Sequence, residues 1–169
     1  MTKFYITGIA GTGKSSIIKE LNKRGIKAFD VDNRDFCYWV DKNGERAKYE
    51  LGIGKEWIKA HDYLCDKEKL KTLLDSQKDE LIFVSGIADN QDEYLDWFDK
   101  IFVLNCEKET LLDRLKNRDT NNFAKEKSEQ EYVLESYEEF VDSLNKKGAI
   151  SINSESDVKE VTDKILLYI

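Results

Sequence analysis

The stretch Gly8-Ile9-Ala10-Gly11-Thr12-Gly13-Lys14-Ser15 decides the fold, because it matches the pattern G-x-x-x-x-G-K-[ST] at every specified position. The preceding run, Lys3 to Thr7, is β-branched and aromatic, which is typical of a buried strand. From Lys14 onward, apolar residues repeat at helical spacing. A strand, a glycine loop and a helix in this order form the structural context that the motif requires. The sequence therefore predicts a phosphate-binding loop at the start of the first helix.

The residue types in this loop explain how it would hold a phosphate. Glycines allow backbone conformations that are closed to residues with a Cβ, so that successive N–H groups can surround an anion. The helix N-terminus adds a partial positive charge. We expect Lys14 to reach the β- and γ-phosphates of ATP and the Ser15 hydroxyl to face Mg²⁺, which makes ATP and Mg²⁺ the predicted cofactors. The predicted nucleotide-binding residues are Gly8, Gly11, Thr12, Gly13, Lys14, Ser15 and Ser16.

The rest of the chain alternates short apolar runs with segments of helical periodicity. Four further strands are predicted at residues 26–29, 81–84, 101–104 and 149–152. Four further helices are predicted at residues 67–77, 107–118, 129–146 and 157–169. Strands that alternate with helices of this length favour right-handed crossovers and a parallel sheet covered on both faces. The predicted fold is α/β, with three α/β/α layers around a five-stranded parallel sheet.

Two segments do not fit this simple alternation. Residues 34–69 place a long aromatic-rich insertion between the second strand and its next helix, and we predict that it forms a helical cap over an acceptor site. Residues 119–127 are polar and lack periodicity, which predicts a short lid loop. At 169 residues the chain is predicted to form a single domain, residues 1–169, that carries both additions.

Composition and charge exclude several classes of partner. The formal net charge is −7 at pH 7, so the surface as a whole repels polyanions, and neither nucleic acid nor an anionic membrane is an expected partner. No run approaches the ~18 apolar residues that a membrane span needs, and the N-terminus lacks a secretory pattern, so a cytoplasmic protein is expected. The three cysteines are scattered and are predicted to be reduced. Nothing in the sequence predicts the oligomeric state.

A guanine-nucleotide switch is the first competing interpretation of the glycine loop. Asp41-Lys42-Asn43-Gly44 fits the short pattern D-x-x-G that reads a γ-phosphate in that class. However, the pattern N-K-x-D that would read guanine is missing, because Asn22-Lys23 and Asn145-Lys146 are the only Asn-Lys pairs and neither is followed by x-Asp. Guanine specificity is therefore not predicted, and a non-enzymatic nucleotide-binding switch remains an alternative.

The order of motifs resembles the adenylate-kinase-like and shikimate-kinase-like branch of P-loop small-molecule kinases. The resemblance covers nearly the whole chain. It rests on the phosphate loop, Asp30-x-Asp32, Ser85-Gly86, Arg114-x-x-x-Arg118 and a late strand followed by a C-terminal helix. It implies an ATP-dependent kinase that transfers the γ-phosphoryl group to a small-molecule hydroxyl. A nucleoside monophosphate kinase is the alternative, and it is less favoured because the cap offers only two arginines, Arg34 and Arg46.

Asp30 and Asp32 follow the second predicted strand and lie two residues apart. On a continued extended chain their side chains would share a face at the sheet edge where ligands of open α/β sheets bind. Carboxylates there can hold Mg²⁺ through water or accept the proton of an attacking hydroxyl. The resemblance implies Asp30 as the metal residue and Asp32 as the base that faces the acceptor, although the residues alone leave these two roles interchangeable.

Further site residues are predicted around the lid and the third strand. Arg114 and Arg118 lie four residues apart, hence on one face of the predicted helix, where they would clamp the transferring phosphoryl group when the loop closes. A solvated helix face is the alternative for such a pair. Arg34, Gly86 and Asn90 are predicted to contact the acceptor. The predicted catalytic set is therefore Lys14, Asp32, Arg114 and Arg118, with the metal at Ser15 and Asp30.

Overall fold

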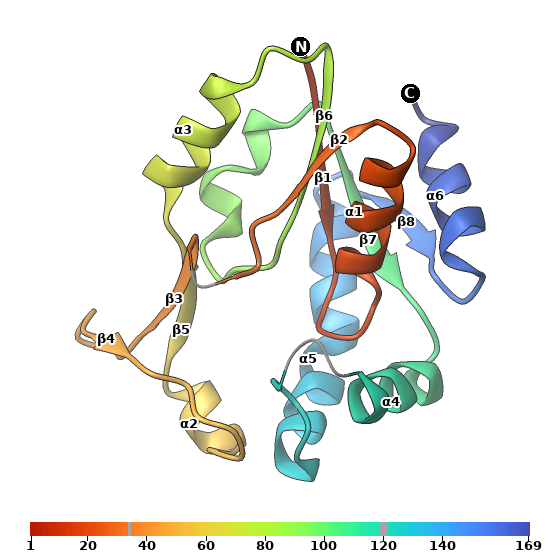
Figure 1. Ribbon diagram of the computed structural model, residues 1–169. Coiled ribbons are helices and arrows are strands. Elements are labelled where there is room, and N and C mark those ends of the chain that lie inside the picture. The colour runs from red at the N-terminus through yellow and green to blue at the C-terminus, as the bar shows by residue number, and fades with distance from the viewer. Residues whose placement is uncertain (34, 119–121) are drawn as a thin grey trace.

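A five-stranded parallel sheet forms the centre of the protein. The computed structural model describes residues 1–33, 35–118 and 122–169. The strands follow the order β2-β6-β1-β7-β8 across the sheet, and every neighbouring pair is parallel (Figure 1). Their bounds are Thr2–Thr7 for β1, Lys27–Asp30 for β2, Leu81–Ser85 for β6, Lys100–Asn105 for β7 and Ile150–Asn153 for β8. The five predicted parallel strands are thus confirmed, each within a few residues.

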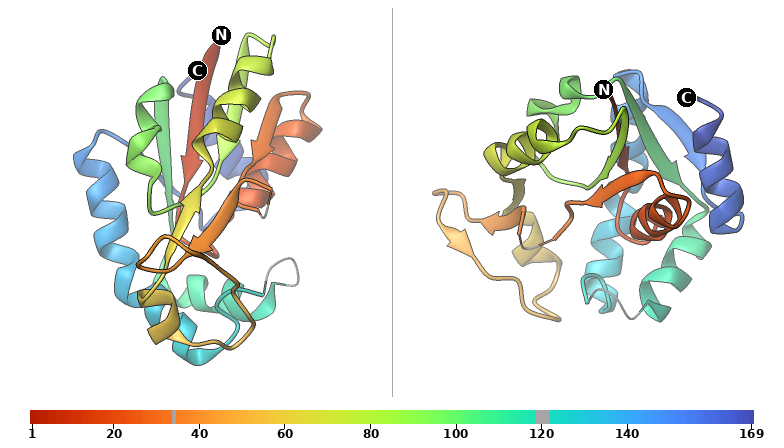
Figure 2. Two further views of the ribbon diagram at one scale, coloured as in Figure 1. Left: turned by 90° about the vertical axis from the view of Figure 1, so that its left-hand side faces the viewer. Right: turned by 45° about the horizontal axis from the view of Figure 1, so that its top comes forward.

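Helices cover both faces of this sheet, as Figure 2 shows from two further directions. Helices α1 (Lys14–Lys23) and α6 (Val158–Leu166) pack on one face. Helices α3 (Lys67–Ser76) and α5 (Lys127–Lys146) pack on the other, together with two short 3₁₀ turns, η1 (Gln91–Glu93) and η2 (Leu95–Trp97). Helix α4 (Lys108–Asn117) follows β7 and packs against α5. The predicted three-layer α/β/α architecture is confirmed.

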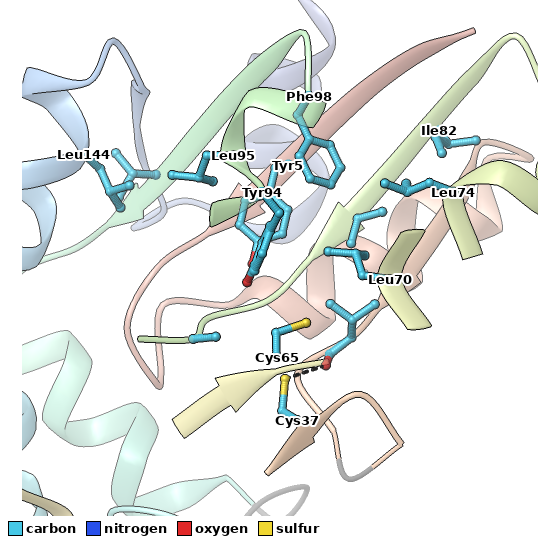
Figure 3. Close-up of a cluster of buried hydrophobic side chains, with 14 residues drawn as sticks. Tyr5, Cys37, Cys65, Leu70, Leu74, Ile82, Tyr94, Leu95, Phe98 and Leu144 are labelled. Atoms are coloured by element: carbon cyan, nitrogen blue, oxygen red, sulfur yellow. Dashed lines mark hydrogen bonds between the residues drawn. The ribbon is translucent and has the colours of Figure 1, made fainter. Parts of the chain in front are cut away.

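The central strand β1 shows why the sheet needs cover on both sides. Successive side chains of a strand point to opposite faces, so Phe4 and Ile6 enter the core under α1 and α6 while Tyr5 enters the opposite core. All three are buried. Figure 3 shows the second core, in which the Tyr5 ring packs against Phe98 with ring centroids 4.9 Å apart. A strand with both faces buried reads as a continuous apolar run, which is why β1 was predictable.

The insertion departs from its predicted form. Instead of a helical cap, it holds a three-stranded antiparallel sheet of order β4-β3-β5, and its helix α2 (Lys55–Lys59) is only five residues long. The strands are Cys37–Val40 for β3, Arg46–Ala47 for β4 and Asp62–Cys65 for β5. The prediction of a helical insertion is therefore wrong. The run Cys37–Val40 is aromatic and apolar, and pairing with β5 satisfies backbone groups that a single run of four residues cannot satisfy alone.

The insertion joins the main core through two cysteines. Cys37 and Cys65 are direct partners in the β3–β5 ladder, and both lie at the edge of the core that Figure 3 displays. Both are free and buried, as is Cys106, so the prediction of three reduced cysteines is confirmed. The Cys37 thiol donates to the Val31 carbonyl over 3.2 Å. This contact fixes the start of β3 against the end of β2.

The segment predicted to form a lid, residues 119–127, is described only in part. Residues 119–121 lie outside the described residues, residues 122–126 form a loop, and Lys127 is already the first residue of α5. Ala124 lies at the centre of the described part, is fully buried and has a left-handed φ of 58°.

Among the described residues, no helix combines the length and the apolar character needed to cross a membrane.

Candidate active site

The glycine loop between β1 and α1 is held in shape by close internal contacts. A Cβ on Gly8 would lie 2.5 Å from the Thr12 hydroxyl, and that hydroxyl itself donates to the Ile9 carbonyl over 2.8 Å. Gly13 precedes the helix with a φ of 103°, in a region that favours glycine. Helix α1 begins at Lys14, so its N-terminus, where N–H groups lack intrahelical partners, lies in the loop. The loop therefore presents backbone N–H donors to an anion. The Thr12 side chain packs inside the loop, where its hydrogen bond to Ile9 holds the loop in shape.

Lys14 places its ammonium group between the loop and the end of β2. The side chain is only 6% exposed, and Nζ donates to the Gly8 carbonyl over 2.7 Å. The same atom lies 3.5 Å from Oδ2 of Asp32. The other Asp32 oxygen, Oδ1, accepts from the Tyr63 hydroxyl over 3.2 Å. Two residues predicted separately, the loop lysine and the candidate base, thus form one charged pair.

Tyr63 is a site residue that sequence reasoning did not identify. Burial, and next the negative charge of Asp32, raise the pKa of the Tyr63 phenol well above its ordinary value. The phenol therefore stays protonated at neutral pH and donates to Asp32. Because this donor and Lys14 occupy different oxygens, they fix the orientation of the carboxylate at the edge of the sheet.

Asp30 and Ser15 form a second pair beside the loop. The Ser15 hydroxyl donates to Oδ2 of Asp30 over 2.5 Å, and Oδ1 of Asp30 accepts from the Asp32 backbone N–H over 3.1 Å. A hydroxyl and a carboxylate next to a phosphate loop suit Mg²⁺, which is commonly held by one or two protein oxygens together with phosphates and waters. Within the described part of the chain, no group of three or more acidic, His or Cys side chains gathers into a larger metal site. The Ser15 hydroxyl and the Asp30 carboxylate could therefore supply the one or two protein oxygens that a magnesium–nucleotide site needs.

The two predicted clamp arginines do not share one helical face. Helix α4 ends at Asn117, and Arg118 follows in an extended conformation with φ −71° and ψ 140°. Arg114 donates to the Ser154 carbonyl over 2.8 Å, at the loop after β8. Both arginines nevertheless line the same cleft.

Arg118 carries one bonded and one unbonded side-chain donor. Its guanidinium donates to the Phe123 carbonyl, while Nε is buried without a hydrogen-bond partner among the described residues. Partial burial lowers the pKa of Arg118, and the negative charge of Asp32 acts against that shift. A buried donor without a partner is unfavourable, so an anion bound in the cleft would be a favourable partner for it.

These groups surround one large cleft of about 1490 Å³. The loop residues 9–17 line one part of it, the insertion lines a second, and Arg114, Arg118 and Phe123 line a third. Figure 1 shows why: the insertion and the α4–α5 region both lie at the end of the main sheet where the loop after β1 is found. Ligands of open α/β sheets bind at this edge, beyond the carboxyl ends of the strands. The cleft has room for a nucleotide and a second small molecule.

Of the three further residues predicted to contact an acceptor, two make structural contacts instead and the third lies outside the described residues. Arg34 lies outside the described residues. Gly86 is packed at the end of β6, where a Cβ would lie 2.9 Å from the Tyr5 hydroxyl and 3.0 Å from Val31. The Asn90 side chain accepts from Cys65 N over 2.8 Å and donates to Cys65 O over 3.0 Å. Gly86 and Asn90 are therefore corrected to structural residues that join the sheet to the insertion.

A buried glutamate joins the insertion to the loop before α5. Glu129 is fully buried, and Oε2 accepts from the Tyr49 hydroxyl over 2.8 Å and from Ala124 N over 2.9 Å. Its other oxygen, Oε1, lies 3.5 Å from Gly54 N. No local signal in the sequence distinguishes Glu129 from the exposed acids of α5, because Tyr49 and Gly54 lie far away in the chain. The insertion side of the cleft is thus assembled around the buried Glu129 side chain.

The parallel sheet, the phosphate loop and the Lys14–Asp32 pair define the class of P-loop small-molecule kinases. The sequence matches the family described as an AAA domain, AAA_18, over residues 5–134, and the chain belongs to this family. The predicted branch of kinases and the predicted class of enzyme, a phosphotransferase, are confirmed.

Comparisons with individual proteins agree with this class. Dephospho-CoA kinase of Streptococcus agalactiae serotype III (strain NEM316) is 25% identical, with coverage of 76% of this chain and 80% of that protein. Deoxyadenosine kinase from M. mycoides with bound dATP has a similar fold, with a TM-score of 0.56, 19% identity and coverage of 99% and 98% of the two chains. Shikimate kinase from Acinetobacter baumannii in complex with shikimate has a TM-score of 0.58, 17% identity and coverage of 99% and 92%.

Proposed function

We propose that the protein is an ATP-dependent kinase that transfers the γ-phosphoryl group to a hydroxyl group of a small molecule. The observation that carries this proposal is the Lys14–Asp32 pair, in which the loop ammonium lies 3.5 Å from a carboxylate at the sheet edge. The ammonium can neutralise the transferring phosphoryl group while the carboxylate receives or orients the acceptor hydroxyl. Phosphoryl transfer needs this alignment and charge compensation more than it needs covalent chemistry from the protein.

The proposed roles of the other residues follow from their positions. The backbone of the glycine loop binds the phosphates, and Arg118, with its unpaired Nε, stabilises charge on the transferring group. Arg114, which is bound to Ser154, lines the cleft near the loop after β8. Ser15 and Asp30 would hold Mg²⁺, which when bound neutralises the phosphate oxygens. Asp32 is the proposed base because it lines the cleft, where Lys14 and Tyr63 hold its two oxygens, whereas the Asp30 carboxylate is bound to the Ser15 hydroxyl.

The relatives support a kinase and differ in the acceptor that their names imply. Dephospho-CoA, deoxyadenosine and shikimate are chemically unlike one another, but each carries a hydroxyl group that can accept a phosphoryl group. The structure of deoxyadenosine kinase from M. mycoides has dATP bound, which supports nucleotide binding by this fold. We infer from this that the phosphate-binding half of the site is common to the class, while the insertion determines the acceptor.

A coupled ADP-release assay with a panel of hydroxyl acceptors and nucleoside monophosphates tests the proposal. We expect Mg²⁺-dependent ADP release with at least one hydroxyl acceptor. Asp32→Asn should lower kcat by about 10²-fold or more while ATP affinity stays nearly unchanged. Asp92→Asn is the matched control, because Asp92 also lines the cleft but pairs with Lys147. Equal loss in both variants, or full activity of Asp32→Asn, would remove Asp32 from the mechanism, and turnover on monophosphates alone would overturn the hydroxyl assignment.

A further inference from the structure

The insertion side of the cleft is an aromatic wall, which we define as Trp39, Tyr49, Tyr63 and Phe123. All four rings line the cleft and all are half-buried, so each keeps some exposed surface. Trp39 is their centre: its ring centroid lies 4.9 Å from that of Tyr63, 6.4 Å from that of Tyr49 and 6.4 Å from that of Phe123. Partly exposed aromatic faces gathered around a cleft favour a flat, weakly polar ligand group that stacks on them.

The aromatic wall reaches the proposed reaction centre directly. Tyr63 belongs to both, because its ring contacts Trp39 and its hydroxyl donates to Asp32 over 3.2 Å. The distance from the wall to the carboxylate is thus spanned by one tyrosine side chain. A ligand that stacks on Trp39 brings a hydroxyl to Asp32 only when a short arm, of about the length of a sugar, connects the ring to that hydroxyl.

The charges on this side of the cleft disfavour a phosphate on the acceptor. The Arg46 guanidinium stacks on the Tyr38 ring, with Cζ 3.3 Å from the ring centroid. Lys48 Nζ lies 3.7 Å from Oε1 of Glu50. Each cation thus has a partner on the insertion itself, and the Lys48 side chain is 80% exposed to solvent. Asp89 lines the same region, and its Oδ2 accepts from Tyr63 N over 2.6 Å. An acidic group beside the aromatic wall complements a ring that carries N–H or amino groups better than it complements an anion.

We propose that the acceptor is an unphosphorylated nucleoside-type molecule, a nitrogen heterocycle joined through a short sugar-like arm to the hydroxyl that is phosphorylated. The inference rests on the proposed kinase function and names its substrate class. In the transfer step, the bond between the γ-phosphorus and the bridging oxygen of ATP breaks, a bond from the acceptor oxygen to that phosphorus forms, and the hydroxyl proton passes to Asp32. The products are ADP and the phosphorylated acceptor.

Calorimetric titration of the full chain, saturated with a non-hydrolysable ATP analogue and Mg²⁺, tests the inference separately from catalysis. The probes are the common purine and pyrimidine nucleosides, their 5′-monophosphates, and aliphatic hydroxyl compounds such as sugar acids. We expect at least one nucleoside to bind at least about tenfold more tightly than its monophosphate. Trp39→Leu should weaken that binding about tenfold or more, and Trp39→Phe should retain most of it, because stacking on a base contributes at about this level.

Trp57→Leu is the matched control for the loss of an indole ring. The Trp57 ring lies 5.3 Å from Trp39 in the same aromatic group, but Trp57 does not line the cleft. This variant should leave nucleoside affinity within about twofold, and both variants should bind the ATP analogue normally. Equal weakening by Trp39→Leu and Trp57→Leu would show a purely structural role and overturn the stacking assignment.

The outcomes separate the substrate class from the proposed function. Absence of nucleoside binding, tighter binding of a monophosphate, or binding confined to aliphatic hydroxyl compounds would each overturn the nucleoside inference. If an aliphatic acceptor is phosphorylated, the kinase function stands while this inference fails. If nucleosides bind in a Trp39-dependent way but no acceptor is phosphorylated, the binding site is supported and the kinase function fails.

Discussion

The Tyr49 hydroxyl donates to the fully buried carboxylate of Glu129 over 2.8 Å, and this bond joins the insertion to the first turn of α5. The same carboxylate oxygen accepts from Ala124 N, so one buried charge organises both the insertion and the loop before α5. A buried carboxylate is tolerated when several donors satisfy it, and it becomes destabilising when they are removed.

Replacement of Glu129 should therefore destabilise the protein and weaken acceptor binding. Glu129→Gln keeps the volume but turns one oxygen into a donor, which then faces donors, so we expect a loss of about 1–3 kcal/mol in the free energy of unfolding. Tyr49→Phe, which removes only one hydrogen bond, should cost about 1 kcal/mol. Urea denaturation of both variants and of the double variant measures the coupling. If the two losses simply add, the hydrogen bond does not join these elements.

Lys14 is buried, and its ammonium group contacts the Gly8 carbonyl and the Asp32 carboxylate. Lys14→Met keeps the length and removes the charge. We expect ATP binding to weaken by about tenfold or more, because a charge-assisted contact to phosphate contributes about 1.5–3 kcal/mol. The melting temperature should change by only about 5 °C or less. Calorimetry and thermal melts check this, and normal ATP affinity would contradict the assignment of the loop.

Gly11 is required by conformation and by space. Its φ is 92°, and a Cβ there would lie 3.0 Å from Leu111 Cδ1 and 3.2 Å from the Leu115 side chain. Gly11→Ala should therefore combine backbone strain with overpacking, about 2–4 kcal/mol together. Gly25 is the matched control, because its φ is 80° but a Cβ would meet nothing within 4 Å. Gly25→Ala should cost only about 1–2 kcal/mol. Similar losses in urea denaturation for the two variants would mean that α4 moves to admit the methyl group.

The sequence was a good guide to elements whose signals are local. Strand β1, the glycine loop and α1 were all predicted from adjacent residues, and the apolar stripe of α5 was visible in Val133, Tyr137 and Leu144. The strands of the insertion were not predicted, because β3 pairs with β5 over a long sequence separation. The ladder joins Val40 to Asp62 and Cys37 to Cys65, which lie 62 − 40 = 22 and 65 − 37 = 28 positions apart. Periodicity within a window cannot report a partner at that separation.

In the candidate site, too, the residues with a local sequence signal were predicted and those placed by long-range contacts were not. Lys14, Ser15, Asp30 and Asp32 carry a motif or follow a predicted strand, and the structure brings them together. Asn90 looked like an acceptor contact because its segment follows a strand, but its amide is used by the backbone of Cys65. Glu129 looked like any exposed acid of an amphipathic helix. What these two side chains contact depends on how the insertion folds back, which no local pattern encodes.

Ion pairs between α2 and α5 make the docking of the insertion sensitive to acid. Lys59 and Lys55 both donate to Glu135, over 2.9 Å and 3.1 Å, and these bonds, that of Lys59 first, lower the pKa of the Glu135 carboxyl below its ordinary value. A carboxyl whose pKa is lowered by folding stabilises the folded state above its unfolded pKa of about 4.3, and this contribution is lost as pH falls through the folded pKa.

Glu135→Gln should therefore be less stable than the wild type at pH 7, and the difference should shrink as the pH falls through the lowered folded pKa and disappear below it, where the wild-type carboxyl is protonated in both the folded and the unfolded state. The pairs are exposed, so the difference at pH 7 should also shrink in about 1 M salt, where the Debye length is about 3 Å. Hydrogen exchange of the α2 amides, compared between the two proteins across this pH range, measures docking locally. Glu139→Gln, on an exposed position of the same helix with no ion pair to α2, is the control. A difference that stays unchanged after the pH has fallen below the folded pKa of Glu135 would show that Glu135 acts through packing rather than through its charge.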